Sequence, residues 1–513
     1  MIDERDLWAL IEARANLTPD RTLLIDERSQ EIGFAAFRDR AERVAAGLAE
    51  LGVTSGDRVS WQLPTWIESA VLIGALARLG AVQNPILPIY RERELRHILG
   101  EVQPKRLVVP SVWRDFDYAK LARTVVEGSE TTVLICDRTL PEGDPAALPR
   151  IPSEGRDANA IRWILYTSGT TSSAKGALHS DASIAAGSIG VCESLRIEPE
   201  DRWAIPFPVT HISGIGMLMV FLMTGSSGAY VEQVGESTPK LLGSLGCTYA
   251  AGGTPLVIRY LEEQRRHPTR PLFPKLKAAM AGAAPKPPQL HGQVRDEMGG
   301  LGVVSCYGST EVPFISVSLS DDDDERLART EGRANRRAEL RIADEEGRPL
   351  PSGGIGEIRV RGPQVCRGYL DVSLDRDAFD TDGFFRTGDL GWADAEGYLT
   401  ITGRLKDVII RNGENLSAKE IEDVLFDHEG IAEATVIGLA DLTRGERCCA
   451  VVVPRSGAEI GLEGIAQFCR DAGLASQKIP EQLEFVEALP RNASGKVLKH
   501  ELQARFETLP RGG

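Results

Sequence analysis

The amino-acid sequence predicts an α/β protein with a large N-terminal region of mainly parallel sheets and a smaller α+β C-terminal domain. The first observation behind this prediction is that strand-like and helix-like segments alternate from the start of the chain to about residue 400. Such alternation is typical of β-α-β units, which build parallel sheets. The second observation is the length of 513 residues, which at roughly 150 residues per domain favours more than one domain.

The N-terminal segments follow in a clear order. Apolar residues recur at helical spacing in residues 34–51, where Phe37, Val44 and Leu48 fall near one face. The same reasoning predicts strand 57–63, helix 66–79, strand 106–109, strand 162–166, a helix after Asp181 and strand 303–306. The uncharged run 211–231 predicts a buried helix, because glycine and serine interrupt it and its apolar block is too short to cross a membrane.

The character of the sequence changes after the acidic run 321–325, which predicts a solvated loop. Residues 357–361 and 398–401 predict strands of a β-rich segment with glycine-rich turns. Beyond residue 403 the chain has its own apolar segments, which is typical of a separate domain. Its expected elements are strand 408–411, helix 418–426, strands 434–439 and 450–453, then a helix, a strand and a terminal helix. We therefore expect one domain at residues 1–402 and another at residues 403–513.

The composition excludes several classes of protein. Hydrophobic residues make up 42% and charged residues 26% of the chain, as in ordinary globular proteins. The formal net charge of −15 argues against a general nucleic-acid or anionic-membrane binder. The 8 cysteines lack the spacing of a zinc site and suit reduced thiols. The charged N-terminus does not resemble a signal peptide, so we expect a cytoplasmic protein without a membrane span.

The most informative segment is YTSGTTSSAKG at residues 166–176. Its backbone N–H groups, hydroxyls and one ammonium, placed between a strand and a helix, would form a cradle for phosphate oxygens. It is not a Walker A loop, because GxxxxGK[ST] is absent and Lys175 precedes Gly176. On composition alone, a flexible loop rich in serine and glycine is the alternative.

This segment resembles the phosphate-binding signature YTSGTTGxPKG of the adenylate-forming superfamily, which contains acyl-CoA synthetases, luciferases and peptide-synthetase adenylation domains. Further segments match that family in the expected order, namely YGSTE at 307–311, TGD at 387–389, GRLKD at 403–407 with GEN at 413–415, and PRNASGK at 490–496. The resemblance covers residues 10–506. Ser172 and Ala174 stand where the family usually has glycine and proline, and Ala418 replaces a common proline.

The resemblance implies an ATP-dependent carboxylate–CoA ligase that forms AMP, with Mg²⁺ as cofactor. Because its first step brings an anion to a polyanion, catalysis needs charge neutralisation and alignment. Lys496 is the expected cation between carboxylate and α-phosphate, Glu311 the expected Mg²⁺ ligand, and Thr310 an expected partner of the α-phosphate. Tyr307 is expected to stack on adenine and Asp389 to bind the ribose hydroxyls. The expected ATP-binding residues are Thr167, Ser168, Gly169, Thr170, Thr171, Lys175, Gly282, Ala283, Ala284, Pro285, Cys306, Tyr307, Gly308, Ser309, Thr310, Asp389 and Arg404.

The resemblance also implies an acyl pocket and a C-terminal domain that moves as a lid over nucleotide bound between the two regions. His211 matches a position beside the carboxylate and thiol tunnel, and joins Lys496, Thr310 and Glu311 as a catalytic candidate. Lys406 is the expected hinge, with Gly413 and Glu414 near CoA. The expected acyl pocket contains His211, Gly214, Met217, Gly252 and Phe314. No aspartate near His211 matches the usual anchor of an α-amine, so an apolar acid (medium-chain fatty, alicyclic or aryl) is favoured over an amino acid.

Other interpretations stay open at this point. One alternative is an enzyme that loads a carrier-protein thiol, although we expect no fused carrier domain after Lys496. A second alternative is a luciferase-like oxygenase. A catalytically silent relative that only binds nucleotide is a further alternative, supported by Ser172 and Ala174 but opposed by Lys496, Glu311 and Asp389. The expected partners are a small carboxylic acid, ATP and CoA, without nucleic acid. The sequence leaves the oligomeric state open, a homodimer included.

Overall fold

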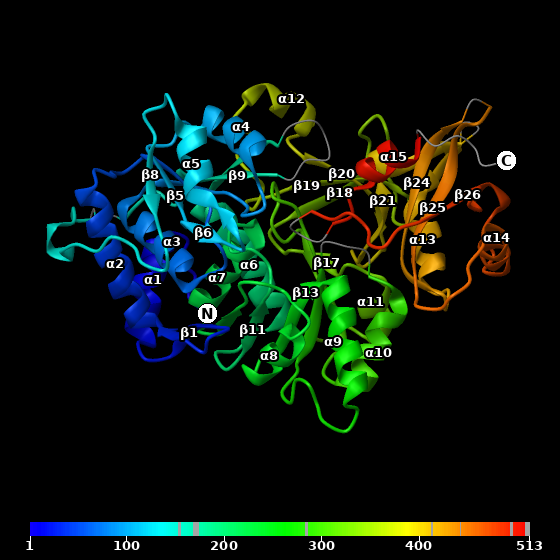
Figure 1. The fold of residues 1–513 in the computed structure, drawn as a ribbon, viewed down its shortest axis with the longest axis horizontal. Coiled ribbons are helices and arrows are strands. Elements are labelled where there is room, and N and C mark those ends of the chain that lie inside the picture. The colour runs from blue at the N-terminus through cyan, green and yellow to red at the C-terminus, as the bar shows by residue number, and fades with distance from the viewer. Residues whose placement is uncertain are drawn as a thin grey trace. The chain divides into compact units, whose positions relative to one another are not determined.

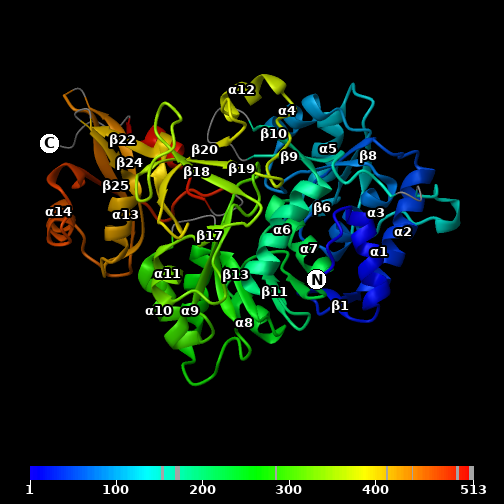
Figure 2. The same cartoon turned by 180° about the vertical axis from the view of Figure 1, so that it is seen from behind.

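A computed structural model describes residues 1–151, 155–167, 174–282, 286–411, 414–441, 443–492 and 496–507 (Figures 1 and 2). The chain divides into two compact units. The first comprises residues 1–282, 289–339 and 360–385, and the second contains residues 340–359 and the chain from residue 386 onward. The predicted α/β class is confirmed, while the expected domain boundary near residue 403 stays a prediction.

The first unit contains a six-stranded sheet in the order β10-β9-β4-β3-β5-β8. Its strands are β3 (Arg58–Trp61), β4 (Val82–Pro85), β5 (Arg106–Val109), β8 (Thr132–Ile135), β9 (Ile161–Tyr166) and β10 (Gly176–Ser180). All neighbours are parallel except β9 and β10, which form an antiparallel edge. The connecting helices are α2 (Phe34–Glu50), α3 (Ile67–Leu79), α4 (Glu92–Val102) and α5 (Tyr118–Val126). The predicted helices at 34–51 and 66–79 and strands at 57–63, 106–109 and 162–166 are therefore confirmed.

A nine-stranded sheet completes this unit, in the order β17-β16-β15-β14-β13-β11-β12-β1-β2. Its strands are β1 (Thr22–Asp26), β2 (Glu31–Gly33), β11 (Arg202–Ile205), β12 (Ser227–Tyr230), β13 (Tyr249–Gly253), β14 (Ala278–Gly282), β15 (Val303–Tyr307), β16 (Ser316–Val317) and β17 (Arg333–Ala334). Within this sheet, the neighbouring strands from β15 through β14, β13, β11 and β12 to β1 are parallel. Strand β2 at one edge and strands β16 and β17 at the other are antiparallel to their neighbours. The sheet is therefore mainly parallel, as predicted.

Alternate residues of the nine-stranded sheet face two different layers of helices. Trp203, Ile205 and Tyr249 belong to the same core cluster as α1 (Leu7–Leu17), α3, α6 (Asp181–Leu195) and α7 (Ile212–Thr224). Ala204 and Ala250, the next residues in register, instead pack with α9 (Thr254–Arg266) and α10 (Pro288–Met298). Figure 1 shows α9 and α10 beside each other. The two-residue period of a strand thus produces a layered core.

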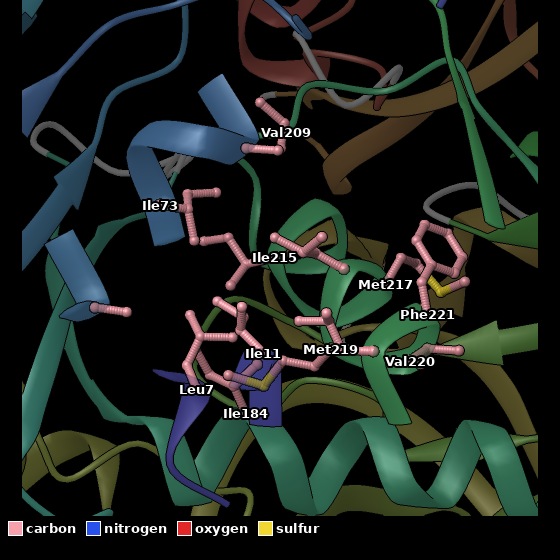
Figure 3. Close-up of a cluster of buried hydrophobic side chains, with 14 of the residues drawn as sticks. Leu7, Ile11, Ile73, Ile184, Val209, Ile215, Met217, Met219, Val220 and Phe221 are labelled. Atoms are coloured by element: carbon pink, nitrogen blue, oxygen red, sulfur yellow. The ribbon is translucent and has the colours of Figure 1, made fainter. Parts of the chain in front are cut away.

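Helix α7 is the centre of the first core cluster. Its described residues from 214 to 224 are all buried. Ile215 and Met219 lie among side chains of α1, α3 and α6 (Figure 3), and Met217 belongs to the same core cluster. This confirms the buried helix predicted within residues 211–231. Among the residues with described positions, no helix is both long enough and apolar enough to cross a bilayer.

Most residues of a four-stranded sheet belong to the second unit. Its strands are, in order, β18 (Glu339–Ala343), β19 (Gly356–Arg361), β20 (Phe385–Ala393) and β21 (Leu399–Arg404). The second unit also contains a five-stranded sheet of β22 (Val408–Arg411), β23 (Glu414–Ser417), β24 (Ile431–Asp441), β25 (Gly445–Pro454) and β26 (Gln482–Phe485). Cys448, Ala450 and Val452 pack with α13 (Ala418–Phe426) and α14 (Leu462–Asp471). Cys449 and Val451 pack with α15 (Lys499–Glu507) on the opposite face. The predicted strand and helix order is confirmed, with β23 as an additional strand.

One expectation needs correction. The acidic run 321–325 was predicted to be a loop, but its last two residues begin helix α11 (Asp324–Arg329). The Asp323 carboxylate accepts a hydrogen bond from the Arg326 N–H and so caps the helix. Acidic side chains favour a helix N-terminus because they complement its unpaired N–H groups and its dipole.

Arg14 joins α1 to the end of α7. Its side chain is only 4% exposed, and it donates hydrogen bonds from Nε to the Leu222 carbonyl at 2.7 Å and from an η nitrogen to the Met223 carbonyl at 2.6 Å. The last carbonyls of a helix have no partners within the helix. Arg14 therefore satisfies the Leu222 carbonyl and shares the Met223 carbonyl with the Ile2 N–H, which donates to it at 2.9 Å.

We expect Arg14→Met to lower the free energy of unfolding of the first unit by about 2 to 4 kcal/mol, because two buried carbonyls lose a charged donor. Urea unfolding followed by tryptophan fluorescence measures the change. Arg376→Met is the matched control, since the Arg376 side chain is 89% exposed and such changes usually stay within about 0.5 kcal/mol. Equal midpoints for the two variants would contradict the role of Arg14.

Candidate active site

The hydroxyl-rich loop connects two antiparallel strands. Tyr166 of β9 lies opposite Gly176 of β10, and the Thr167 N–H donates to the Lys175 carbonyl at 3.0 Å. The predicted helix begins at Asp181 as expected, but the five residues of β10 come between loop and helix. Of the expected cradle, Ser168, Gly169, Thr170 and Thr171 lie outside the described residues, together with Ser172 and Ser173.

A distant segment, residues 366–370, runs along the outer side of β10. Leu178 donates its N–H to the Gly368 carbonyl at 2.9 Å and accepts from the Arg367 N–H at 2.8 Å. The Leu370 N–H donates to the Gly176 carbonyl at 2.8 Å. These three backbone bonds hold Tyr369 beside the start of β10. The sequence analysis did not single out this segment, because its position depends on pairing between residues almost two hundred apart.

Tyr369 lies between two of the predicted site residues. Its hydroxyl donates to Glu311 Oε1 at 2.9 Å, and the Lys175 ammonium lies 5.6 Å from the centroid of its ring. Burial, then the charge of Glu311, raise the pKa of Tyr369 above its usual range, so the phenol keeps its proton and acts as the donor. The structure thus brings Lys175 and Glu311 to one tyrosine.

The loop after β15 presents the predicted residues Thr310 and Glu311. The Ser309 N–H donates to the Val312 carbonyl at 3.0 Å, which makes the loop a tight turn. A Cβ atom at Gly308 would lie 2.6 Å from the Phe314 nitrogen, so only glycine allows the chain to fold back here. The Glu311 carbonyl also accepts from the Cys366 N–H at 2.8 Å. The turn is therefore fixed mainly through its backbone.

His179 is a second residue that the sequence analysis missed. It is fully buried in β10, and burial lowers its pKa to about 4, so the ring is neutral at neutral pH. Nε2 lies 2.8 Å from the Thr310 carbonyl and Nδ1 lies 2.9 Å from the Ser183 hydroxyl. Because a carbonyl only accepts, we assign the ring proton to Nε2. His179 thus fixes the turn that carries Thr310.

The carboxyl ends of β13, β14 and β15 meet at one edge of the nine-stranded sheet, where α/β proteins commonly bind ligands. Gly253 lies opposite Gly282 in the register of β13 and β14. A Cβ atom at Gly282 would come within 3.0 Å of the Cys306 carbonyl, and β15 ends at Tyr307. Small residues thus line the edge where the adenine was expected, whereas Ala283, Ala284 and Pro285 lie outside the described residues.

His211 caps the start of α7. Its Nδ1 accepts from the Ser213 N–H at 3.3 Å and lies 2.7 Å from the Ser213 hydroxyl. Burial lowers the pKa of His211 to about 4, so the ring is neutral at neutral pH. A Cβ atom at Gly214 would lie 2.7 Å from the Val209 Cα, so this glycine allows close approach of the two segments.

The other expected acyl-pocket residues are well packed. Met217 is 3% exposed and Phe314 is 6% exposed, and both belong to the core cluster around α7. At the end of β13, a Cβ atom on Gly252 would lie 2.9 Å from a methyl group of Leu256. The acyl pocket itself stays a prediction.

In the second unit, Asp389 of β20 lies opposite Arg404 of β21. Arg404 Nε is 2.7 Å from Asp389 Oδ1, and Asp389 is only 4% exposed. The Asp389 N–H donates to the Thr387 hydroxyl at 3.0 Å. The ion pair holds the carboxylate in one orientation, which suits recognition of two adjacent hydroxyls.

Lys496 belongs to the same unit and lies shortly before α15 in the chain. Its N–H donates to Asn492 Oδ1 at 2.9 Å, and its carbonyl accepts from the Asn492 N–H at 2.9 Å. Burial, followed by the positive charges of Arg404 and Lys406, lowers the pKa of Lys496 to about 7. Residues from two separate motifs, Lys496 from one and Arg404 and Lys406 from the other, thus act on one another, with the carboxylates of Asp389 and Asp407 partly opposing the effect on Lys496.

The expected hinge and CoA residues lie near the link between the two sheets of this unit. Lys406 is in the 3₁₀ turn Leu405–Asp407, between β21 and β22. Glu414 is exposed at the start of β23, and Gly413 lies outside the described residues. Their hinge and CoA roles stay predictions.

Comparison with known protein families shows which family the chain belongs to. A family model of AMP-binding enzymes matches residues 11–370, and a model of the C-terminal domain of these enzymes matches residues 420–496. The chain belongs to the AMP-binding enzymes. The resemblance inferred from the motifs is therefore confirmed.

Individual AMP-binding enzymes resemble the chain over nearly its whole length. The medium-chain fatty-acid–CoA ligase of Escherichia coli is 31% identical over 96% of this chain and 88% of the relative. The sulfoacetate–CoA ligase of Cupriavidus necator is 32% identical over 97% of both chains. The structure of O-succinylbenzoate coenzyme A synthetase from Bacillus subtilis with ATP and magnesium ion has a TM-score of 0.83, 27% identity and coverage of 96% and 98%.

We expect the Lys496 amine to become reactive around pH 7, because it loses its proton as the pH rises through its lowered pKa. Reductive methylation at a series of pH values, quantified by peptide mass spectrometry with exposed Lys120 as reference, gives the midpoint. Arg404→Gln removes a neighbouring positive charge and should shift that midpoint upward. A midpoint above about 10, the ordinary range of lysine, would contradict the prediction.

Proposed function

We propose that the protein is an AMP-forming carboxylate–CoA ligase. The carboxylate oxygen of an organic acid attacks the α-phosphorus of ATP, the bond to the β-phosphate oxygen breaks, and pyrophosphate leaves. The sulfur of CoA then attacks the acyl carbon, AMP leaves, and the thiol proton passes to solvent. The main observation behind this proposal is that Tyr369 contacts both the Lys175 ammonium and the Glu311 carboxylate.

The chemistry explains why such an arrangement is useful. A carboxylate is a poor electrophile, so it must be activated before a thiol can displace an oxygen from it. Activation brings an anion to a polyanion, and positive side chains lower the barrier by neutralising charge that is already aligned. Lys175 would bind phosphate oxygens, whereas Lys496 would bridge the carboxylate and the α-phosphate. Thr310, held by His179 through its backbone, would donate to an α-phosphate oxygen.

Glu311 fits a Mg²⁺ ion that accompanies ATP. No group of three or more metal-binding side chains occurs in the part of the chain that the structure describes. Mg²⁺ needs no such group, because it keeps several waters and takes phosphate oxygens together with one or two carboxylates. When bound, the ion would neutralise phosphate charge. The similar synthetase structure with ATP and magnesium ion supports this assignment.

We propose an apolar acid, either medium-chain fatty, alicyclic or aryl, as the substrate and CoA as the acceptor. Met217 and Phe314, the larger residues expected at the acyl pocket, are apolar. The relative named for medium-chain fatty acids supports this choice, although the one named for sulfoacetate shows that similar chains differ in substrate. Because burial lowers the pKa of His211 to about 4, its ring is a weak base, which suits a residue that lines the pocket rather than a general base. The cytoplasmic location and a homodimer stay predictions.

The deciding experiment measures exchange of labelled pyrophosphate into ATP with a panel of carboxylic acids. Acid-dependent exchange followed by acyl-CoA formation supports the proposal. Exchange without transfer to CoA, but with transfer to a carrier protein, would identify a carrier-loading enzyme instead. No exchange with any acid would favour a silent nucleotide-binding protein.

Lys496→Ala should lower the rate of pyrophosphate exchange by roughly 10²- to 10³-fold, the usual effect of removing one group that stabilises developing charge. Thiolation of a supplied acyl-adenylate should remain largely intact, because that step no longer joins two anions. Lys120→Ala, at an exposed position, is the control. Equal loss in both half-reactions would exclude the assigned role.

Asp389→Ala should weaken ATP binding by roughly 10- to 100-fold, as expected when a charged acceptor of hydrogen bonds is lost. Isothermal titration with ATP and 2′-deoxy-ATP is the measurement. The wild type should prefer ATP, and the variant should bind both nucleotides with nearly equal affinity. Asp377→Ala, whose side chain is 82% exposed in the wild type, should behave as the wild type. Retention of the ribose preference by Asp389→Ala would remove Asp389 from the ribose site.

A further inference from the structure

Tyr369 contacts both a predicted phosphate-binding cation and the predicted metal ligand. Its hydroxyl donates to Glu311 Oε1 at 2.9 Å, and its ring lies 5.6 Å from the Lys175 ammonium. The side chain is only 3% exposed. Because it is surrounded by protein, its hydroxyl and ring have fixed directions rather than a range of rotamers.

The backbone around Tyr369 is fixed as firmly as its side chain. Tyr369 forms an antiparallel bridge with Ala177 of β10. Ala177 directly follows Lys175 and Gly176, the last two residues of the hydroxyl-rich segment 166–176. The Tyr369 N–H donates to the Asp375 carboxylate at 2.8 Å. The neighbouring Cys366 N–H donates to the Glu311 carbonyl at 2.8 Å. The same short segment therefore contacts the strand that directly follows Lys175 and the turn that carries Glu311.

The two contacts of Tyr369 act on opposite charges. A hydroxyl that donates to one carboxylate oxygen restricts rotation of the carboxylate and leaves the other oxygen to a metal ion. Carboxylates that bind metals are commonly held in this way, and removal of the partner typically costs 10- to 100-fold in metal affinity. The face of the ring attracts the ammonium by its quadrupole, which orients Lys175 before phosphate arrives.

We propose that Tyr369 is a positioning residue that sets the separation between the metal-binding carboxylate of Glu311 and the phosphate-binding ammonium of Lys175. The inference rests on the proposed function, because it takes Glu311 as the ligand of the metal that accompanies ATP. Its hydroxyl acts on the metal ion, whereas its ring acts on the phosphates. The two roles are therefore separable by substitution.

The test compares Tyr369→Phe, which removes only the hydroxyl, with Tyr369→Leu, which also removes the aromatic ring. Tyr118→Phe is the matched control, because Tyr118 is also buried and its hydroxyl donates to the Pro88 carbonyl at 2.7 Å in another part of the unit. Electron paramagnetic resonance of Mn²⁺ with ATP and without acid gives metal affinity, and titration with pyrophosphate gives phosphate affinity. The Mg²⁺ dependence of pyrophosphate exchange is measured in parallel.

For Tyr369→Phe we expect Mn²⁺ affinity in the presence of ATP to fall by roughly tenfold or more, with pyrophosphate affinity unchanged. Tyr369→Leu should lose affinity for both, and Tyr118→Phe for neither. Because Mn²⁺ binding requires no acid, this result would stand even if exchange were absent and the proposed reaction were wrong. Wild-type metal affinity and Mg²⁺ dependence in Tyr369→Phe, in an enzyme that exchanges pyrophosphate, would overturn the role of Tyr369 and leave the proposed reaction intact.

Discussion

The pairing of residues 366–370 with β10 controls how charge is arranged in the first unit. Lys175 directly precedes β10, whereas Glu311 belongs to a turn after a different strand of a different sheet. Backbone hydrogen bonds along β10 place Tyr369 where it contacts both. A cation and a carboxylate recognise a metal–phosphate group only at a suitable separation, so this pairing is the constraint on which the proposed chemistry depends.

The second constraint is that an acidic protein must gather positive charge locally to bind a polyanion. The formal net charge is −15, yet Lys496, Arg404 and Lys406 lie near one another in the second unit. Their mutual repulsion and the burial of Lys496 disfavour the charged amine, and its pKa falls accordingly. Bound phosphate would add negative charge beside the Lys496 amine and favour its charged form, so the cluster is suited to an anionic ligand.

Much of the fold follows from local patterns. Helix α13 and strands β5 and β22 have the bounds that the sequence predicts, because apolar spacing and flanking turn residues are strong there. Strands β10 and β23 were not anticipated, since short strands take their stability from neighbours that are distant in sequence. The start of α11 within an acidic run was missed because the Asp323 cap outweighs the polarity of the segment.

The sequence by itself determined the family, the α/β class and the identity of the charged residues in the candidate site, since these depend on residue type and on spacing along the chain. Only the tertiary structure decided which of them meet. Tyr369 and His179 have no local signature, because their contacts with Glu311 and Thr310 join segments from separate parts of the chain. The grouping of Lys496 with Arg404 was equally hidden. Hydrogen bonds and charge interactions act through space, and only packing brings such partners within reach.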